Sequence, residues 1–188
     1  MSLIQKISPV GIDTTINDVQ VSLFNYLTTT AGWTKYESYH RAYKNPLGEN
    51  TIPEVYVGDN EYKEVLFDDK FSATSFFLVE DNASSSGDVG AEVFTQRISI
   101  ILQVILSELY PAIPHRADAE MQDDVMKAFD QSPQEVSNII VGVDNVYSDL
   151  TLRNRLKEEV GLTDMSDFHV VRFDFEIEYE YDCKYTEL

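Results

Sequence analysis

The residues best suited to chemistry in this sequence are His115, Arg116, Asp118 and Glu120, which lie together where a helix is expected to begin. An imidazole beside two carboxylates could bind a metal ion or act in general acid–base catalysis. Asp118 and Glu120 are two residues apart, however, and such positions point to different sides of a helix. Carboxylates in a first helical turn are also favoured by the helix dipole. The pattern therefore favours a helix start, and a small hydrolase with a carboxylate-bound metal is kept as an alternative.

No other set of residues has the spacing of a catalytic or metal-binding motif. The three histidines, His40, His115 and His169, match no zinc-binding pattern. The single cysteine, Cys183, can neither form a disulfide within the chain nor build a metal cluster. The sequence contains no glycine-rich phosphate loop and no Gly-x-Ser-x-Gly elbow. We therefore predict a protein that is not an enzyme, with no catalytic residue, no metal and no cofactor.

Composition and charge limit the classes of partner that this protein is expected to bind. The chain has 188 residues, of which 43% are hydrophobic, and this suits a single packed domain over residues 1–188. Its formal net charge of −19 disfavours ordinary nucleic-acid binding, which needs Lys and Arg to displace phosphate counterions. The same charge disfavours docking on anionic membranes. The sequence shows no secretory signal and no apolar stretch of membrane-spanning length.

The clearest structural pattern is the alternation of apolar and charged residues from Phe168 to Tyr181. Period-two alternation is typical of a β-strand with one face on a core and the other turned outward. The apolar row consists of Val171, Phe173, Phe175, Ile177, Tyr179 and Tyr181. The opposite face carries an acidic row, which consists of Asp174, Glu176, Glu178 and Glu180. We predict that the acidic row faces solvent or lines a channel whose negative wall does not bind DNA phosphates.

Hydrophobic periodicity predicts the remaining elements and an α+β fold. Helices are expected over residues 16–29, 116–130 and 152–160, and strands over residues 36–43, 54–57, 62–66, 73–79 and 92–106. The last of these strands is apolar on both faces, which predicts a central position with a helix on at least one face. The predicted architecture is a mainly antiparallel (mixed) twisted β-sheet with two or three helices packed on one face.

Three segments are predicted to lie outside this framework. Residues 1–15 read as an extended N-terminal arm, and residues 150–167 as a helical insertion. Residues 80–90 read as a flexible hairpin loop because they are rich in Ser, Asn, Asp and Gly. The loop residues that we expect a partner to order are Asn82, Ser84, Ser85, Ser86, Gly87 and Asp88.

Several short segments resemble the tail terminator, or tail-completion, family of head–tail connector proteins from tailed bacteriophages. They are Pro53 to Tyr56, Glu61 to Leu66, Asp68 to Lys70, Ser75 to Phe77, His115 to Asp118 and His169 to Phe175. The resemblance implies a small α+β subunit that forms a closed homo-oligomeric ring at the head-proximal end of the tail. Such a ring ends tail-tube polymerisation and joins head to tail around the DNA channel.

The resemblance also implies the partners and the location. The chain would bind copies of itself, as a hexamer or a dodecamer, and tail-tube or neck and portal proteins. DNA would pass through without specific binding, no membrane would be involved, and the protein would be assembled in the host cytoplasm into the virion. Two other functions stay open: a neck or tail ring of a short-tailed phage, and an acidic adaptor that mimics DNA for a basic partner.

Overall fold

The computed structural model describes residues 1–47, 50–65, 68, 70–86, 93–142 and 168–180. The strands in this part of the chain are β1 (Ser2–Ile4), β2 (Tyr36–Leu47), β3 (Asn50–Gly58), β4 (Glu61–Glu64), β5 (Ala73–Ser86), β6 (Val93–Ile105), β7 (Val136–Gly142) and β8 (Phe168–Glu180). The helices are α1 (Ile12–Thr29), α2 (Leu106–Leu109) and α3 (Asp118–Phe129).

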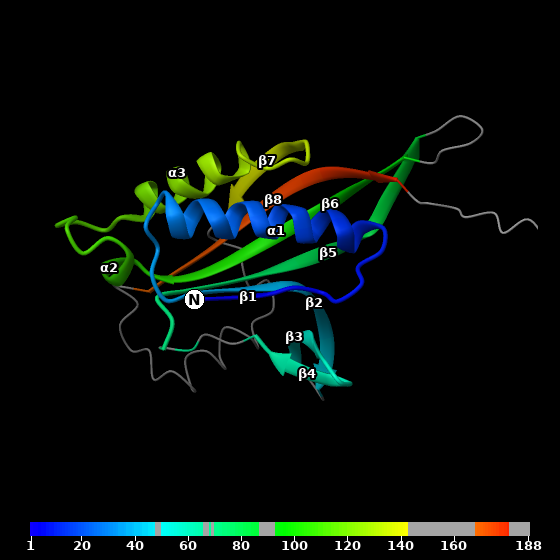
Figure 1. Cartoon of the computed structure of the whole chain (residues 1–188), viewed down its shortest axis with the longest axis horizontal. Helices are drawn as coiled ribbons and strands as arrows, with labels where there is room; N and C mark the ends of the chain where they lie inside the picture. The colour runs from blue at the N-terminus through cyan, green and yellow to red at the C-terminus, as the bar shows by residue number, and fades with distance from the viewer. Residues whose placement is uncertain (48–49, 66–67, 69, 87–92, 143–167, 181–188) are drawn as a thin grey trace, which may run out of the picture.

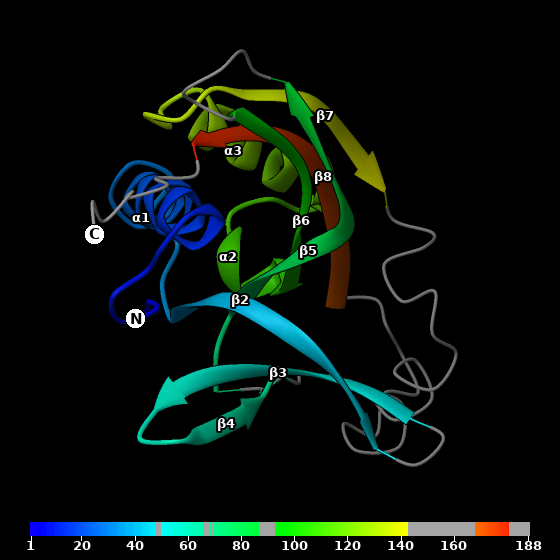
Figure 2. The same ribbon diagram turned by 90° about the vertical axis from the view of Figure 1, so that its right-hand side faces the viewer.

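The described strands form one mixed sheet in the order β4-β3-β2-β5-β6-β8-β7, with β1 beside β2. The β1–β2 and β2–β5 pairs are parallel, and the remaining pairs are antiparallel. Helices α1 and α3 lie on the same side of the sheet (Figure 1), and Figure 2 shows the sheet curving round them. The predicted α+β fold with a mainly antiparallel sheet is therefore confirmed.

The main core lies between the two long helices and the apolar faces of β6 and β8. Phe173 and Phe175 of β8 are buried, and their ring centroids lie 6.1 and 5.0 Å from that of Phe129 in α3. Burying a large apolar side chain contributes about 1.5–3 kcal/mol, so this aromatic group fixes how α3 sits on the sheet.

A second, smaller core lies on the opposite face of the sheet. It includes Tyr39 of β2, Val55 of β3, Phe76 of β5 and Ile101 of β6. The strand β2 makes this possible because its first half pairs with β5 and its second half with β3, which carries β3 and β4 away from the helices (Figure 2). Strand β6 is thus buried on both faces and lies inside the sheet, as its sequence predicts.

The N-terminal prediction is wrong in its boundary. Helix α1 begins at Ile12, after Gly11 with φ +55°, so the extended arm ends before residue 15 and contains β1. Asp13 is buried in the first helical turn, where it forms a salt bridge with Lys6. The helix can include this carboxylate early because a cation from the preceding segment neutralises it.

The flexible loop prediction is also wrong over most of its length. Asn82 to Ser86 continue strand β5, which pairs with β6 from Ala83 opposite Gln96 to Ser86 opposite Val93. The register shifts between Val79 and Ala83, and such a bulge accommodates polar residues without ending the strand. Gly87, Asp88 and the predicted helical insertion of residues 150–167 lie outside the described residues, as do Tyr181 and Cys183.

The alternation in β8 gives a direct test of this packing. We expect Phe175→Ala to lower the free energy of unfolding by about 3–5 kcal/mol, because it leaves a cavity between β8 and α3. The exposed Glu178→Gln on the same strand serves as the control and should change stability by less than about 0.5 kcal/mol. Urea unfolding measures both; equal effects from the two changes would contradict the assigned faces of β8.

Candidate functional site

The acidic row lies on the face of the sheet turned away from α1 and α3, and its first member is neutralised. Asp174 accepts hydrogen bonds from Ser99 Oγ (2.5 Å) and Arg172 Nε (2.5 Å). The Arg97 guanidinium lies 3.6 Å from the same carboxylate. Two guanidinium groups compensate the charge of Asp174, which is therefore part of the scaffold that joins β6 to β8.

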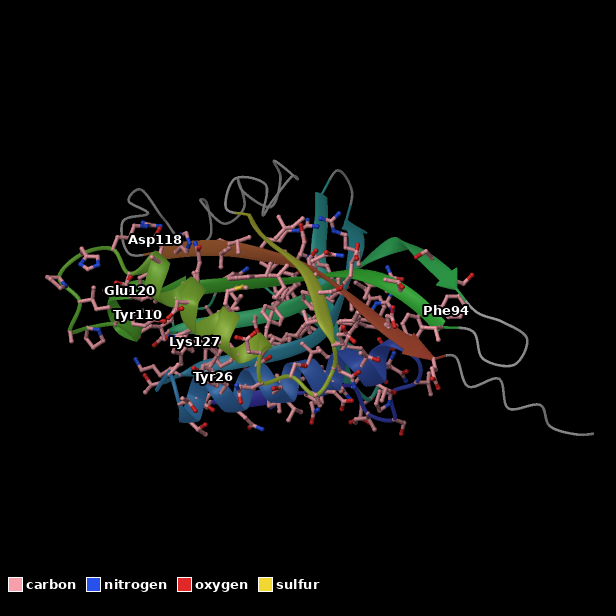
Figure 3. All side chains as sticks on the ribbon, turned by 90° about the horizontal axis from the view of Figure 1, so that it is seen from above. Tyr26, Phe94, Tyr110, Asp118, Glu120 and Lys127 are labelled. Atoms are coloured by element: carbon pink, nitrogen blue, oxygen red, sulfur yellow. The ribbon has the colours of Figure 1, made fainter. Side chains whose placement is uncertain are left out.

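The other members of the acidic row become more exposed toward the end of the strand. Glu176 is partly buried and accepts a hydrogen bond of 2.6 Å from Asn138 Nδ2 of β7. Glu178 and Glu180 are exposed at the C-terminal end of β8, where they pair with Thr95 and Val93 at the start of β6. Phe94 and Tyr179 stack at this end with ring centroids 5.6 Å apart (Figure 3). The exposed part of the acidic row is thus its last two members, Glu178 and Glu180.

The residues at the start of α3 do come together, but as ion pairs and hydrogen bonds. His115 Nε2 lies 3.1 Å from Glu120 Oε1, and Arg116 Nε lies 3.9 Å from Asp118 Oδ1. Arg116 Nη2 also bonds His169 Nδ1 at 2.7 Å, which ties the start of α3 to the start of β8. Figure 3 shows Asp118 and Glu120 on this helix. Because each carboxylate already has a protein partner, the cluster stabilises a helix start.

A buried polar seam joins α1 to the N-terminal segment. Lys6 forms a salt bridge with Asp13, Asn17 Nδ2 donates to the Lys6 carbonyl (3.2 Å), and Gln20 Nε2 donates to the Ile4 carbonyl (3.2 Å). Asp13, Asn17 and Gln20 are spaced four and three residues apart, so they share one helix face. The sequence analysis missed the seam because the same spacing also occurs on solvent-facing helix surfaces. The seam holds the segment before α1 in place.

Large exposed apolar side chains occur on three segments of the part of the chain that the structure describes. The N-terminal patch is Met1, Ile7 and Val10, the hairpin patch is Tyr43, Val57 and Tyr62, and the β7 patch is Ile140 and Val141. Contiguous apolar surface marks sites of association, whereas single exposed apolar side chains are common on monomers. These exposed side chains are not evident from the sequence, because hydrophobicity alone does not distinguish an edge strand from a core strand.

In the part of the chain that the structure describes, no three His, Cys, Asp or Glu side chains are grouped so that they could hold a metal ion. Within the same ranges, no helix has the length and apolar character needed to span a membrane.

Comparison with known proteins leaves the family resemblance as a prediction. No protein-family model matches the chain. A search of curated proteins finds no match either.

The contacts of His169 predict a pH effect on stability. Burial, followed by the nearby Arg116 charge, lowers the pKa of His169 below its usual value, and burial also lowers the pKa of His40. The unfolded chain therefore binds more protons as the pH falls below about 6.5, so the free energy of unfolding decreases. We expect urea unfolding to show this loss between about pH 7.5 and pH 5.5, and His169→Gln to reduce it, with His40 responsible for the remainder. An unchanged slope in His169→Gln would contradict this account.

The ion pairs at the start of α3 also predict a response to metals. We expect Mg²⁺, Ca²⁺, Mn²⁺ and Zn²⁺ at millimolar concentration to leave the melting temperature unchanged, because Asp118 and Glu120 are already paired. Thermal unfolding with each ion measures this. A rise that the Asp118→Asn, Glu120→Gln double variant abolishes would instead support the metal-dependent hydrolase.

Proposed function

We propose that this protein is a non-enzymatic structural protein of a phage virion. It forms a homo-oligomeric ring at the head-proximal end of the tail, where it ends tube polymerisation and joins head to tail around the DNA channel. The resemblance of segments such as Glu61 to Leu66 and His169 to Phe175 to tail terminators supports the location. The observation that carries the proposal is the separation of exposed apolar patches from an exposed acidic sheet end.

The apolar patches support self-association. The N-terminal patch, the hairpin patch and the β7 patch lie on different elements, so one copy can contact different neighbours through different surfaces. Contacts between unlike surfaces are heterologous, and they give a closed ring when the rotation between copies closes. Strands β4 and β7 are the two edge strands of the described sheet, so the hairpin patch and the β7 patch lie at opposite ends of the strand order.

The exposed acidic end of the sheet supports a position of the protein beside DNA that slides through the ring. Glu178 and Glu180 are exposed, whereas Asp174 is neutralised by arginine and Glu176 is tied to Asn138. A wall of uncompensated carboxylates repels phosphates and does not retain a sliding duplex. In the proposed ring these two residues face the lumen.

Light scattering on the purified protein tests the ring. The concentration series is run at low salt and at about 0.5 M salt, since screening weakens repulsion between copies of charge −19. It is repeated with tail tubes purified from the phage that encodes the chain. We expect one discrete mass that is a whole-number multiple of the subunit, either alone or on the tubes.

The other outcomes separate the alternatives. A discrete ring that does not bind tail tubes would instead favour a ring in the neck, or the tail ring of a short-tailed phage. A monomer under every condition would contradict the ring. If that monomer also bound basic proteins in a salt-sensitive way, the acidic adaptor would be favoured.

A further inference from the structure

The β3–β4 hairpin presents an exposed edge of the sheet. Strand β4 is the last strand in the sheet order and, among the described strands, pairs only with β3. All four of its residues, Glu61–Glu64, are exposed. The turn before it is tight, because Asp59 and Asn60 both have positive φ (50° and 63°), as in the two-residue turns that match the twist of paired strands. Another extended chain can therefore add to this well-defined edge strand.

The strand register divides the side chains of the hairpin between two faces. Val55 of β3 pairs with Lys63 of β4, and Val55 is buried in the smaller core. Lys63 turns to the same face, where its ammonium group lies 3.5 Å from Glu37 Oε2 and 4.8 Å from the centroid of the Tyr39 ring. The single cation of β4 is thus directed toward the body of the protein.

The opposite face of the hairpin, which we call the tyrosine face, is contiguous. The register places Tyr43 opposite Glu54, and Glu54 opposite Glu64. It also places Tyr56 opposite Tyr62, and the centroids of these two rings lie 5.3 Å apart. The exposed fractions are 36% for Tyr43 and 58% for Tyr62, and Glu64 is exposed as well. Three tyrosines and two carboxylates therefore form one surface that extends to the edge strand β4.

The chemistry of the tyrosine face favours a cationic occupant. Aromatic rings attract guanidinium and ammonium groups, and carboxylates pair with them. The hairpin sheet already shows one such contact, because the Arg41 guanidinium lies 5.1 Å from the centroid of the Tyr43 ring. A second copy of this chain is a poor occupant, since pairing two copies of β4 would bring the carboxylates of Glu61 and Glu64 together.

We propose that β4 and the tyrosine face bind an extended basic segment of a partner protein. The segment adds to β4 as a further strand through main-chain hydrogen bonds. Because successive side chains of a strand alternate between faces, every second residue of the segment lies on the tyrosine face. Lys or Arg at these positions contacts Tyr62 and pairs with Glu64. This inference goes beyond the proposed ring, because it names a surface for another protein and does not depend on whether copies of the chain close into a ring.

Binding of synthetic peptides to the full chain tests the proposal. The probe is a fluorescently labelled peptide of alternating arginine and valine, and fluorescence anisotropy measures its binding at about 0.1 M salt, where long-range attraction is largely screened. One control peptide has the same sequence with methyl groups on its backbone nitrogens, which keeps the charge but prevents strand pairing. A second control has the same composition with all arginines in one block. We expect the alternating peptide to bind about tenfold or more tightly than either control, since only it can make the main-chain bonds with its cations on one face.

Two double variants with equal charge changes locate the binding surface. Glu54→Gln with Glu64→Gln removes the two carboxylates of the tyrosine face. Asp130→Asn with Glu135→Gln removes two exposed carboxylates outside the hairpin and serves as the control. We expect the first variant to weaken binding of the alternating peptide by about tenfold and the control by less than about twofold. Tyr62→Thr keeps a residue that favours strands but removes the exposed ring, and it should weaken binding by about threefold.

The outcomes separate a specific surface from general attraction to an acidic protein. Equal binding of the alternating and the methylated peptides, or equal losses in the two double variants, would overturn the proposal. Circular dichroism checks the fold of each variant. If the Glu54→Gln, Glu64→Gln variant does not fold, unchanged binding in Tyr62→Thr contradicts the proposal and weakened binding supports it. Light scattering tests the ring separately, so failure of either proposal leaves the other standing.

Discussion

The rest of the structure depends on the burial of one face of β6 and β8 beneath α1 and α3. Phe173 and Phe175 pack on Phe129, and alternate residues of β8 must therefore point to the other side of the sheet. This places the acidic row on the face of the sheet opposite α1 and α3 (Figure 2). A one-residue slip in register would bury the carboxylates and expose the aromatic residues, so packing fixes the pairing strongly.

This constraint also divides the surface by chemistry. Near the centre of the sheet the acidic face is compensated, because Arg97 and Arg172 approach Asp174. At the outer end of β8, Glu178 and Glu180 lie further along the strand than Asp174 and its arginine partners, and they are exposed. The apolar surface lies elsewhere, on the N-terminal segment, on the β3–β4 hairpin and on β7. The hairpin also carries the exposed carboxylates Asp59, Glu61 and Glu64, so apolar and acidic side chains lie together there.

Local sequence patterns predicted the helices and strands that have a strong hydrophobic period. They failed where a contact with a residue distant in the sequence determines the local structure. The alternation in β8, the two-sided burial of β6 and the helix near residues 116–130 all follow from residue spacing. The segment Asn82 to Ser86 reads as a loop but forms strand, because β6 is long enough to supply hydrogen-bond partners. Asp13 was expected in the extended arm of residues 1–15, but it is buried in the first turn of α1, where Lys6 from the preceding segment pairs with it. The acidic row was visible in the sequence, whereas the exposed apolar patches depend on which strand lies at the edge.

In the proposed assembly, copies of this chain close into a ring through unlike surfaces. Electron-microscope images of the assembled protein, averaged without imposed symmetry, would show such a ring. We expect one class of closed rings with a single rotational symmetry and an open centre. Open filaments, two-fold dimers or particles without a central opening would contradict the proposed ring, which requires a heterologous contact whose rotation closes around the DNA channel.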